Sequence, residues 1–211
     1  MGYTRTVEVV ALYATSMGYI EAVVVVYLRA LYYPGGFRFP LTTFPEATAA
    51  VEVAREAATL IMLAAIGTLA GKQLWERFGW FIIAFGVWDI AYYVWLKVLL
   101  DWPASLFEPD ILFLIPLPWI GPVIAPVLIS IIMIGVGYAI TLRFRKGKEF
   151  RPNAAGWVLA AFATAVILSS FLSGNSAVNG FFPTKPYPYA LLFAGLGLYV
   201  LAYLASSRKS G

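Results

Sequence analysis

Four acidic side chains lie inside apolar stretches of the chain. Glu21 is in the first stretch, Glu52 and Glu56 are in the second, and Asp89 is in the third. An ionisable group in the hydrocarbon core of a membrane is costly, so each of these acids is a candidate functional residue. Carboxylates in such a place can bind a cation or carry a proton.

The spacing of these residues predicts a shared site. Glu52 and Glu56 are four residues apart and lie on one face of a helix. Consecutive spans joined by short loops usually pack side by side, and the acids of all three spans fall at similar depths. We therefore expect them to face one interior volume in the outer half of the membrane, with Arg55 or Arg29 as the counter-charge.

A purely structural interpretation of the same residues is also open. A Glu21–Arg55 pair and a Glu52–Arg29 pair would tie the helices together, and buried ion pairs alone are weak evidence for function. Four acids nevertheless outnumber the bases near them. Surplus negative charge in a low-dielectric place requires a proton, a bound cation or water, and this favours a site.

Two tyrosines follow Asp89 at helical spacing. Tyr92 and Tyr93 come three and four residues later and share its helix face. Either hydroxyl can donate a hydrogen bond to the carboxylate and fix its rotamer. The alternative is an interfacial tyrosine pair beside an Asp89 that is hydrogen-bonded to water.

Long apolar helices must position these residues. Of the 211 residues, 61% are hydrophobic and 12% are charged. Apolar runs of ~20 residues cross a ~30 Å hydrocarbon core as helices, since backbone groups there must be satisfied within their own segment. We predict an all-α integral membrane protein, a six-helix transmembrane bundle that forms a single domain over residues 1–211. The predicted spans are about 9–28, 46–70, 80–100, 111–142, 155–172 and 189–205.

The ends of two spans carry specific signals. Thr43, with Glu46 three residues later, predicts an N-cap for the second span. Residues 111–126 contain four prolines, and proline kinks or breaks a helix. We therefore expect the fourth span to be broken, with a short helix or re-entrant piece near the outer face and then a helix from about Val123 to Leu142. Broken helices at membrane depth can line a cavity, and a kinked packing helix is the alternative.

Basic residues are concentrated on one side of the predicted spans. The side richer in Lys and Arg faces the cytoplasm, which predicts a multi-pass protein of the cell membrane with cytoplasmic N- and C-termini. The richer side holds ten basic residues: Arg5, Lys72, Arg77, Arg143, Arg145, Lys146, Lys148, Arg151, Arg208 and Lys209. The other side holds four: Arg29, Arg38, Lys97 and Lys185.

Composition restricts the chemistry. The chain has no cysteine and no histidine, which argues against disulfides, thiol chemistry and the usual haem, zinc and copper sites. We predict no cofactor, and no nucleic-acid partner because the basic residues lie at span ends. Catalytic and metal-ligand assignments stay open. The predicted partner is the lipid bilayer, and a homo-oligomer or a larger membrane complex is an alternative.

One region resembles a known group of proteins. Its motifs are Phe85-Gly86-x-Trp88-Asp89-Ile90-x-Tyr92-Tyr93, Trp102-Pro103-x-Ser105-Leu106 and Pro118-Trp119-x-Gly121-Pro122. They resemble a signature of small, uncharacterised prokaryotic polytopic membrane proteins over roughly residues 80–126. The resemblance implies that these residues act as a unit and implies no particular activity.

Three functions are compatible with these observations. The first is an outward-facing acidic intramembrane pocket that binds or transports a cation, a proton or a small cationic solute. The second is a membrane-embedded enzyme for a lipid-soluble substrate, with carboxylates as acid–base groups or as ligands of a hard divalent metal. The third is a non-catalytic subunit of a larger membrane complex. Surplus carboxylates and a broken helix favour the first.

Overall fold

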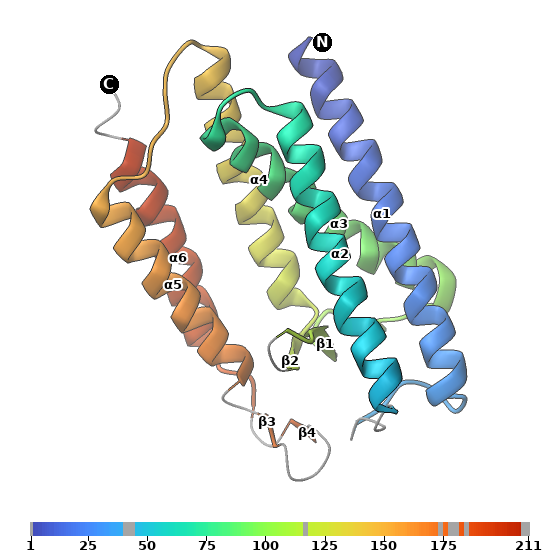
Figure 1. Ribbon diagram of the computed structural model, residues 1–211. Coiled ribbons are helices and arrows are strands. Elements are labelled where there is room, and N and C mark those ends of the chain that lie inside the picture. Colours follow the sequence, from blue (N-terminus) through green and yellow to red (C-terminus); the bar gives the residue numbers. More distant parts are fainter. Residues whose placement is uncertain are drawn as a thin grey trace.

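Helices that are long and apolar enough to cross a membrane dominate the fold (Figure 1). The computed structural model describes residues 2–39, 45–115, 118–172, 175–176, 182–183 and 186–207. Within these residues the helices are α1 (Tyr3–Tyr32), α2 (Glu46–Ala70), α3 (Leu74–Leu100), α4 (Ile124–Arg145), α5 (Ala154–Leu172) and α6 (Tyr189–Ser207). The chain is therefore an all-α, multi-pass membrane bundle, as its hydropathy predicts.

Two helices are longer than their apolar runs. α1 begins at Tyr3 rather than near residue 9, and α3 begins at Leu74 rather than near residue 80. The added turns carry charged residues such as Arg5 and Glu76. A helix continues past the apolar core because each further residue adds a backbone hydrogen bond, so hydropathy alone underestimates its length.

The segment before α4 differs from the prediction. Two short antiparallel strands, β1 (Pro109–Phe113) and β2 (Trp119–Pro122), occupy the place of the expected short helix or re-entrant piece. Pro109 and Pro122 face each other in this pairing, and a two-stranded ribbon has only edge strands, where proline is tolerated. Pro126 then falls in the first turn of α4, where its missing N–H removes no helical bond.

Some predicted features fall on residues outside the described ranges. These are Thr43, the expected N-cap of α2; Pro116, one of the prolines of the expected break; and Lys185, Arg208 and Lys209, which were counted for orientation. The described N-terminus of α2 follows Pro45 and has no side-chain cap hydrogen bond.

α3 is the central helix of the bundle. It packs against α1, α2 and α4, whereas α5 and α6 pack mainly on each other. Two glycines permit close approach beside Asp89. A Cβ on Gly18 of α1 would lie 2.8 Å from the backbone oxygen of Trp88, and a Cβ on Gly86 of α3 would lie 2.7 Å from that of Ser130. Both α1 and α4 therefore come very near the part of α3 that carries Asp89.

The two ends of the bundle differ in structure. The start of α1 and the end of α6 lie at one end, and β1 and β2 lie at the other (Figure 1). We call the end that carries these strands the hairpin end. α1 and α3 finish there, and α2 and α4 begin there. The predicted site residues of α1, α2 and α3 are thereby brought to one end of the bundle.

Candidate functional site

A cavity of about 100 Å³ lies at the hairpin end between α1, α2, α3 and β1. It has room for a few water molecules or a small ion, since one water occupies ~30 Å³ in the liquid. All of the site residues predicted from the sequence line it: Glu21, Arg29, Glu52, Arg55, Glu56, Asp89, Tyr92 and Tyr93.

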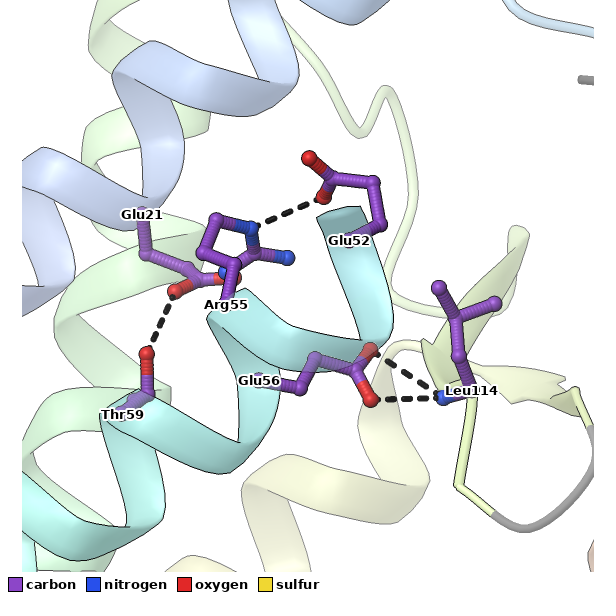
Figure 2. A network of polar contacts seen from close by, with 6 residues as sticks. All are labelled: Glu21, Glu52, Arg55, Glu56, Thr59 and Leu114. Atoms are coloured by element: carbon purple, nitrogen blue, oxygen red, sulfur yellow. Dashed lines mark hydrogen bonds and ion pairs between the residues drawn. The ribbon is translucent and has the colours of Figure 1, made fainter. Parts of the chain in front are cut away.

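Arg55 binds two carboxylates from two helices (Figure 2). Its Nη1 forms an ion pair with Oε1 of Glu21 on α1, and its Nε donates to Oε2 of Glu52 at 2.8 Å. The hydroxyl of Thr59 is 3.5 Å from the other oxygen of Glu21. The predicted pairing of Glu21 with Arg55 is therefore present, and Glu52 shares the same guanidinium.

Glu56 is turned toward the hairpin end and not toward a base. Its side chain points to Leu114, whose backbone N–H lies 3.1 Å from Oε1 and 3.0 Å from Oε2 (Figure 2). Glu56 is only 7% exposed. Among the described residues, no Lys or Arg forms an ion pair with it.

Asp89 has a different partner from the one expected. Its Oδ2 accepts a hydrogen bond of 2.8 Å from the hydroxyl of Ser130 on α4, and neither neighbouring tyrosine donates to it in the structure. Tyr93 donates instead to Asp110, and Tyr92 packs against the Tyr93 ring at 4.8 Å. The Ser130 hydroxyl therefore takes the place of the tyrosine hydroxyl that the sequence allowed as a partner of Asp89.

Arg29 also differs from the prediction, since it pairs with Asp110 of β1 and not with Glu52. Its Nη2 lies 3.5 Å from Oδ1 of Asp110, and Tyr93 donates to Oδ2 at 3.3 Å. The guanidinium stacks over the rings of Phe37 and Trp102, at 4.3 and 3.8 Å from their centroids. These cation–π contacts stabilise a charge that is almost fully withdrawn from solvent.

Asp110 is buried, with 4% of its side chain exposed. Burial raises the pKa of Asp110 to about 6, although Arg29, the Ile111 N–H and the Tyr93 hydroxyl all favour its charged form. The desolvation cost therefore outweighs the ion pair.

Three groups that contact the predicted site residues were not identified from the sequence. Asp110 immediately precedes the apolar run from Ile111 to Ile115, and that position could have marked it as a buried acid. Ser130 is a hydroxyl in the otherwise apolar first half of α4, near the depth of Asp89. The Leu114 N–H had no sequence signal, because it is a backbone group placed by the strand.

The charges around the cavity are unbalanced. Two guanidiniums, those of Arg29 and Arg55, face five carboxylates: Glu21, Glu52, Glu56, Asp89 and Asp110. Three of these carboxylates pair with a guanidinium, whereas Glu56 and Asp89 accept only N–H or O–H hydrogen bonds in the described structure. In the part of the chain that the structure describes, no group of three or more acidic side chains is arranged to hold a metal ion.

Comparisons with other proteins add no family. No protein-family model, curated protein or solved structure matches the chain. The resemblance of residues 80–126 to small prokaryotic membrane proteins therefore stays a prediction. The fold defines the class of the protein, which is a multi-pass, all-α integral membrane protein.

Proposed function

We propose that the acidic cavity binds or transports a cation, a proton or a small cationic solute. The observation that carries this proposal is that Glu56 and Asp89 both line the cavity and have no described guanidinium partner. A desolvated carboxylate without a counter-charge is costly, and a proton or cation in the cavity removes that cost.

The rings around the cavity support a cationic ligand. Trp88 and Tyr92 line it together with Asp89. The face of an aromatic ring attracts a cation, most strongly in a desolvated place. Carboxylates and aromatic faces together suit an ammonium or guanidinium ion as well as a proton.

An apolar cluster lies on the far side of the cavity from the hairpin end. It is built from buried side chains of α1, α2 and α3, among them Leu63, Trp80, Ile83 and Trp88. An ion has no polar partner in such a cluster. The cavity therefore exchanges with the aqueous phase at the hairpin end, and transport to the other phase requires this cluster to rearrange.

The orientation follows from the distribution of basic residues. The ten-to-four asymmetry in Lys and Arg supports a cytoplasmic position for both termini and an outward-facing hairpin end. Peptide tags added at either terminus are expected to resist external protease in right-side-out vesicles. Cleavage of a C-terminal tag under those conditions would contradict this orientation.

Ion binding and flux in proteoliposomes test the proposed function. Intrinsic tryptophan fluorescence, to which Trp88 beside the cavity contributes, provides a binding signal for Na⁺, K⁺, guanidinium and tetramethylammonium, and an enclosed pH-sensitive dye reports proton flux. We expect the wild-type protein to respond to at least one of these ions and Glu56→Gln to lose the response by tenfold or more.

Glu8→Gln is the matched control, because Glu8 is an exposed acid near the opposite end of α1. It is expected to behave as wild type. If none of these ions produces binding or flux in the wild-type protein, or if both variants lose the response equally, the proposal is wrong.

A further inference from the structure

Strand β1 and the residue after it form one wall of the cavity. Ile111, Leu112, Phe113 and Leu114 all line it. The strand runs beside β2, and the pair closes at its base through Val123 N–H to the Glu108 oxygen at 3.0 Å. Displacement of this strand would therefore open one side of the cavity.

Apolar packing holds the two strands on the side of α4 and α5. Trp119 of β2 stacks on Phe171 of α5, with ring centroids 6.0 Å apart. Leu112 packs against the same buried apolar cluster, which contains Phe171. A Cβ on Gly121 would lie 3.0 Å from the Phe171 ring. These contacts do not depend on any carboxylate.

Polar contacts hold the strand on the side of the cavity. The backbone nitrogen of Leu114 lies 3.0–3.1 Å from the two Glu56 oxygens. Among the described residues, this hydrogen bond joins the β1 wall of the cavity to α2. At the other end of β1, Asp110 contacts Arg29 at 3.5 Å and Tyr93 at 3.3 Å. Both attachments use a carboxylate acceptor, and the Glu56 contact is the shorter of the two.

We propose that β1 is a movable cover of the cavity and that Glu56 is its latch. With the cavity empty, the Glu56 carboxylate holds the Leu114 N–H and keeps the strand closed. A cation that binds Glu56 competes for the same oxygens, because a full positive charge outweighs the partial charge of an amide hydrogen. Ligand entry and release of the strand are thereby coupled.

The coupling to a ligand rests on the proposed cation site. The latch itself rests only on the geometry of Glu56, Leu114 and the cavity wall. Donor and acceptor can be removed separately, so the latch can be tested without any ligand.

A single cysteine reports the position of the strand. The chain has no cysteine of its own, and Val25 of α1 lines the cavity. In purified Val25→Cys protein, the rate of modification by N-ethylmaleimide measures access to the cavity. Leu114→Pro removes the N–H and leaves every carboxylate in place, whereas Glu56→Leu removes the acceptor.

Each of these two changes is expected to raise the modification rate at least about tenfold, which corresponds to ~1.4 kcal/mol. The double variant should be no faster than the faster single variant, because both changes remove one contact. Asp89→Asn, which alters a cavity carboxylate that does not contact β1, should label at the rate of the Val25→Cys parent. Thermal unfolding checks that each variant is folded, and Leu114→Pro alone decides the result if Glu56→Leu does not fold.

An unchanged rate in Leu114→Pro, or an equal rise in Asp89→Asn, would overturn the latch and leave the flux experiment on the proposed function unaffected. Adding Na⁺, K⁺, guanidinium or tetramethylammonium to the parent, whichever binds the wild-type protein, should also raise the rate. If the rate rises in the two latch variants and that ion leaves it unchanged in the parent, the latch is supported and its coupling to a cation is wrong.

Discussion

Helices are held together by different chemistry in two regions of the molecule. One is the acidic region, meaning the carboxylates and arginines around the cavity, and the other is the α5–α6 pair. α5 and α6 contain no Asp, Glu, Lys or Arg. Hydroxyl bonds such as Ser170 to Tyr187 at 2.8 Å accompany their contact, and Gly195 allows close approach to Ile167. Small residues and hydroxyls are the usual means of helix association in membranes. Joining helices therefore does not by itself require the carboxylates found among α1, α2, α3 and β1.

A second difference lies within the acidic region. Glu21 and Glu52 share Arg55 and make a closed ion-pair group. Glu56 and Asp89 face the same cavity with only a backbone N–H and a serine hydroxyl as described partners. The first group is explained by structure alone. The second has no described guanidinium partner, and the proposed function depends on it.

The largest expected effect comes from breaking the ion-pair group. Arg55→Met leaves Glu21 and Glu52 without their described counter-charge, and removing one partner of a buried pair costs about 3–5 kcal/mol. Thermal unfolding in detergent should show this loss. The triple variant Glu21→Gln, Glu52→Gln, Arg55→Met should recover most of the lost stability. A loss below ~1 kcal/mol in Arg55→Met alone would show that the ion pairs of Arg55 add little to stability.

The second effect concerns pH. The pKa of Asp110 is about 6 in the folded protein, against 3.8 for an unperturbed aspartate. The folded state therefore binds this proton more tightly than the unfolded chain does, so its stability increases as the pH falls through 6 and decreases as the pH rises. The gap of about two units corresponds to ~3 kcal/mol at most, reached only below about pH 4, where the unfolded carboxyl is protonated too.

Asp110→Asn should remove this part of the pH dependence. The measurement compares unfolding temperatures of the two proteins at about pH 7 and about pH 5, where roughly half of the gain is expected. Identical pH profiles for wild type and Asp110→Asn would contradict the burial of a titrating carboxyl in β1.

The third effect is the change in stability when a glycine at a close helix contact, or one on an open helix surface, is replaced by alanine. Gly86→Ala places a methyl group 2.7 Å from the Ser130 backbone oxygen, and overpacking of this kind costs about 1–3 kcal/mol. Gly197→Ala on α6 is the matched control, because nothing lies within 4 Å of its Cβ. It should be neutral or slightly stabilising. Equal effects in thermal unfolding would mean that α4 does not approach α3 closely beside Asp89.

The smallest effect belongs to the α5–α6 side. Tyr187→Phe removes the hydroxyl that bonds Ser170, while the Ser170 hydroxyl still reaches the Ile167 oxygen at 2.6 Å. The expected cost is about 1 kcal/mol, the usual net value of a neutral hydrogen bond. A loss as large as that of Arg55→Met would remove the contrast between the two regions.

The sequence predicted well what depends on burial in lipid. Apolar length located the helices, and the cost of a charge in hydrocarbon selected acids that are among the residues lining one cavity. It failed where the outcome depends on tertiary geometry. The partners of Asp89 and Arg29 depend on how closely α4 and β1 approach, and proline content could not distinguish a broken helix from two short strands.

We propose that Asp89 is available to positive charge and does not serve only to join α3 and α4. Asp89→Asn keeps the shape of the side chain and an oxygen for the Ser130 hydroxyl, and it strands no described guanidinium. One preparation of this variant should be measured for both unfolding temperature and response to the ion that acts on the wild type. We predict an unfolding temperature near that of wild type and a response reduced tenfold or more. A marked loss of stability with a normal response in the surviving protein would show that Asp89 only joins α3 and α4 and that the ion binds elsewhere.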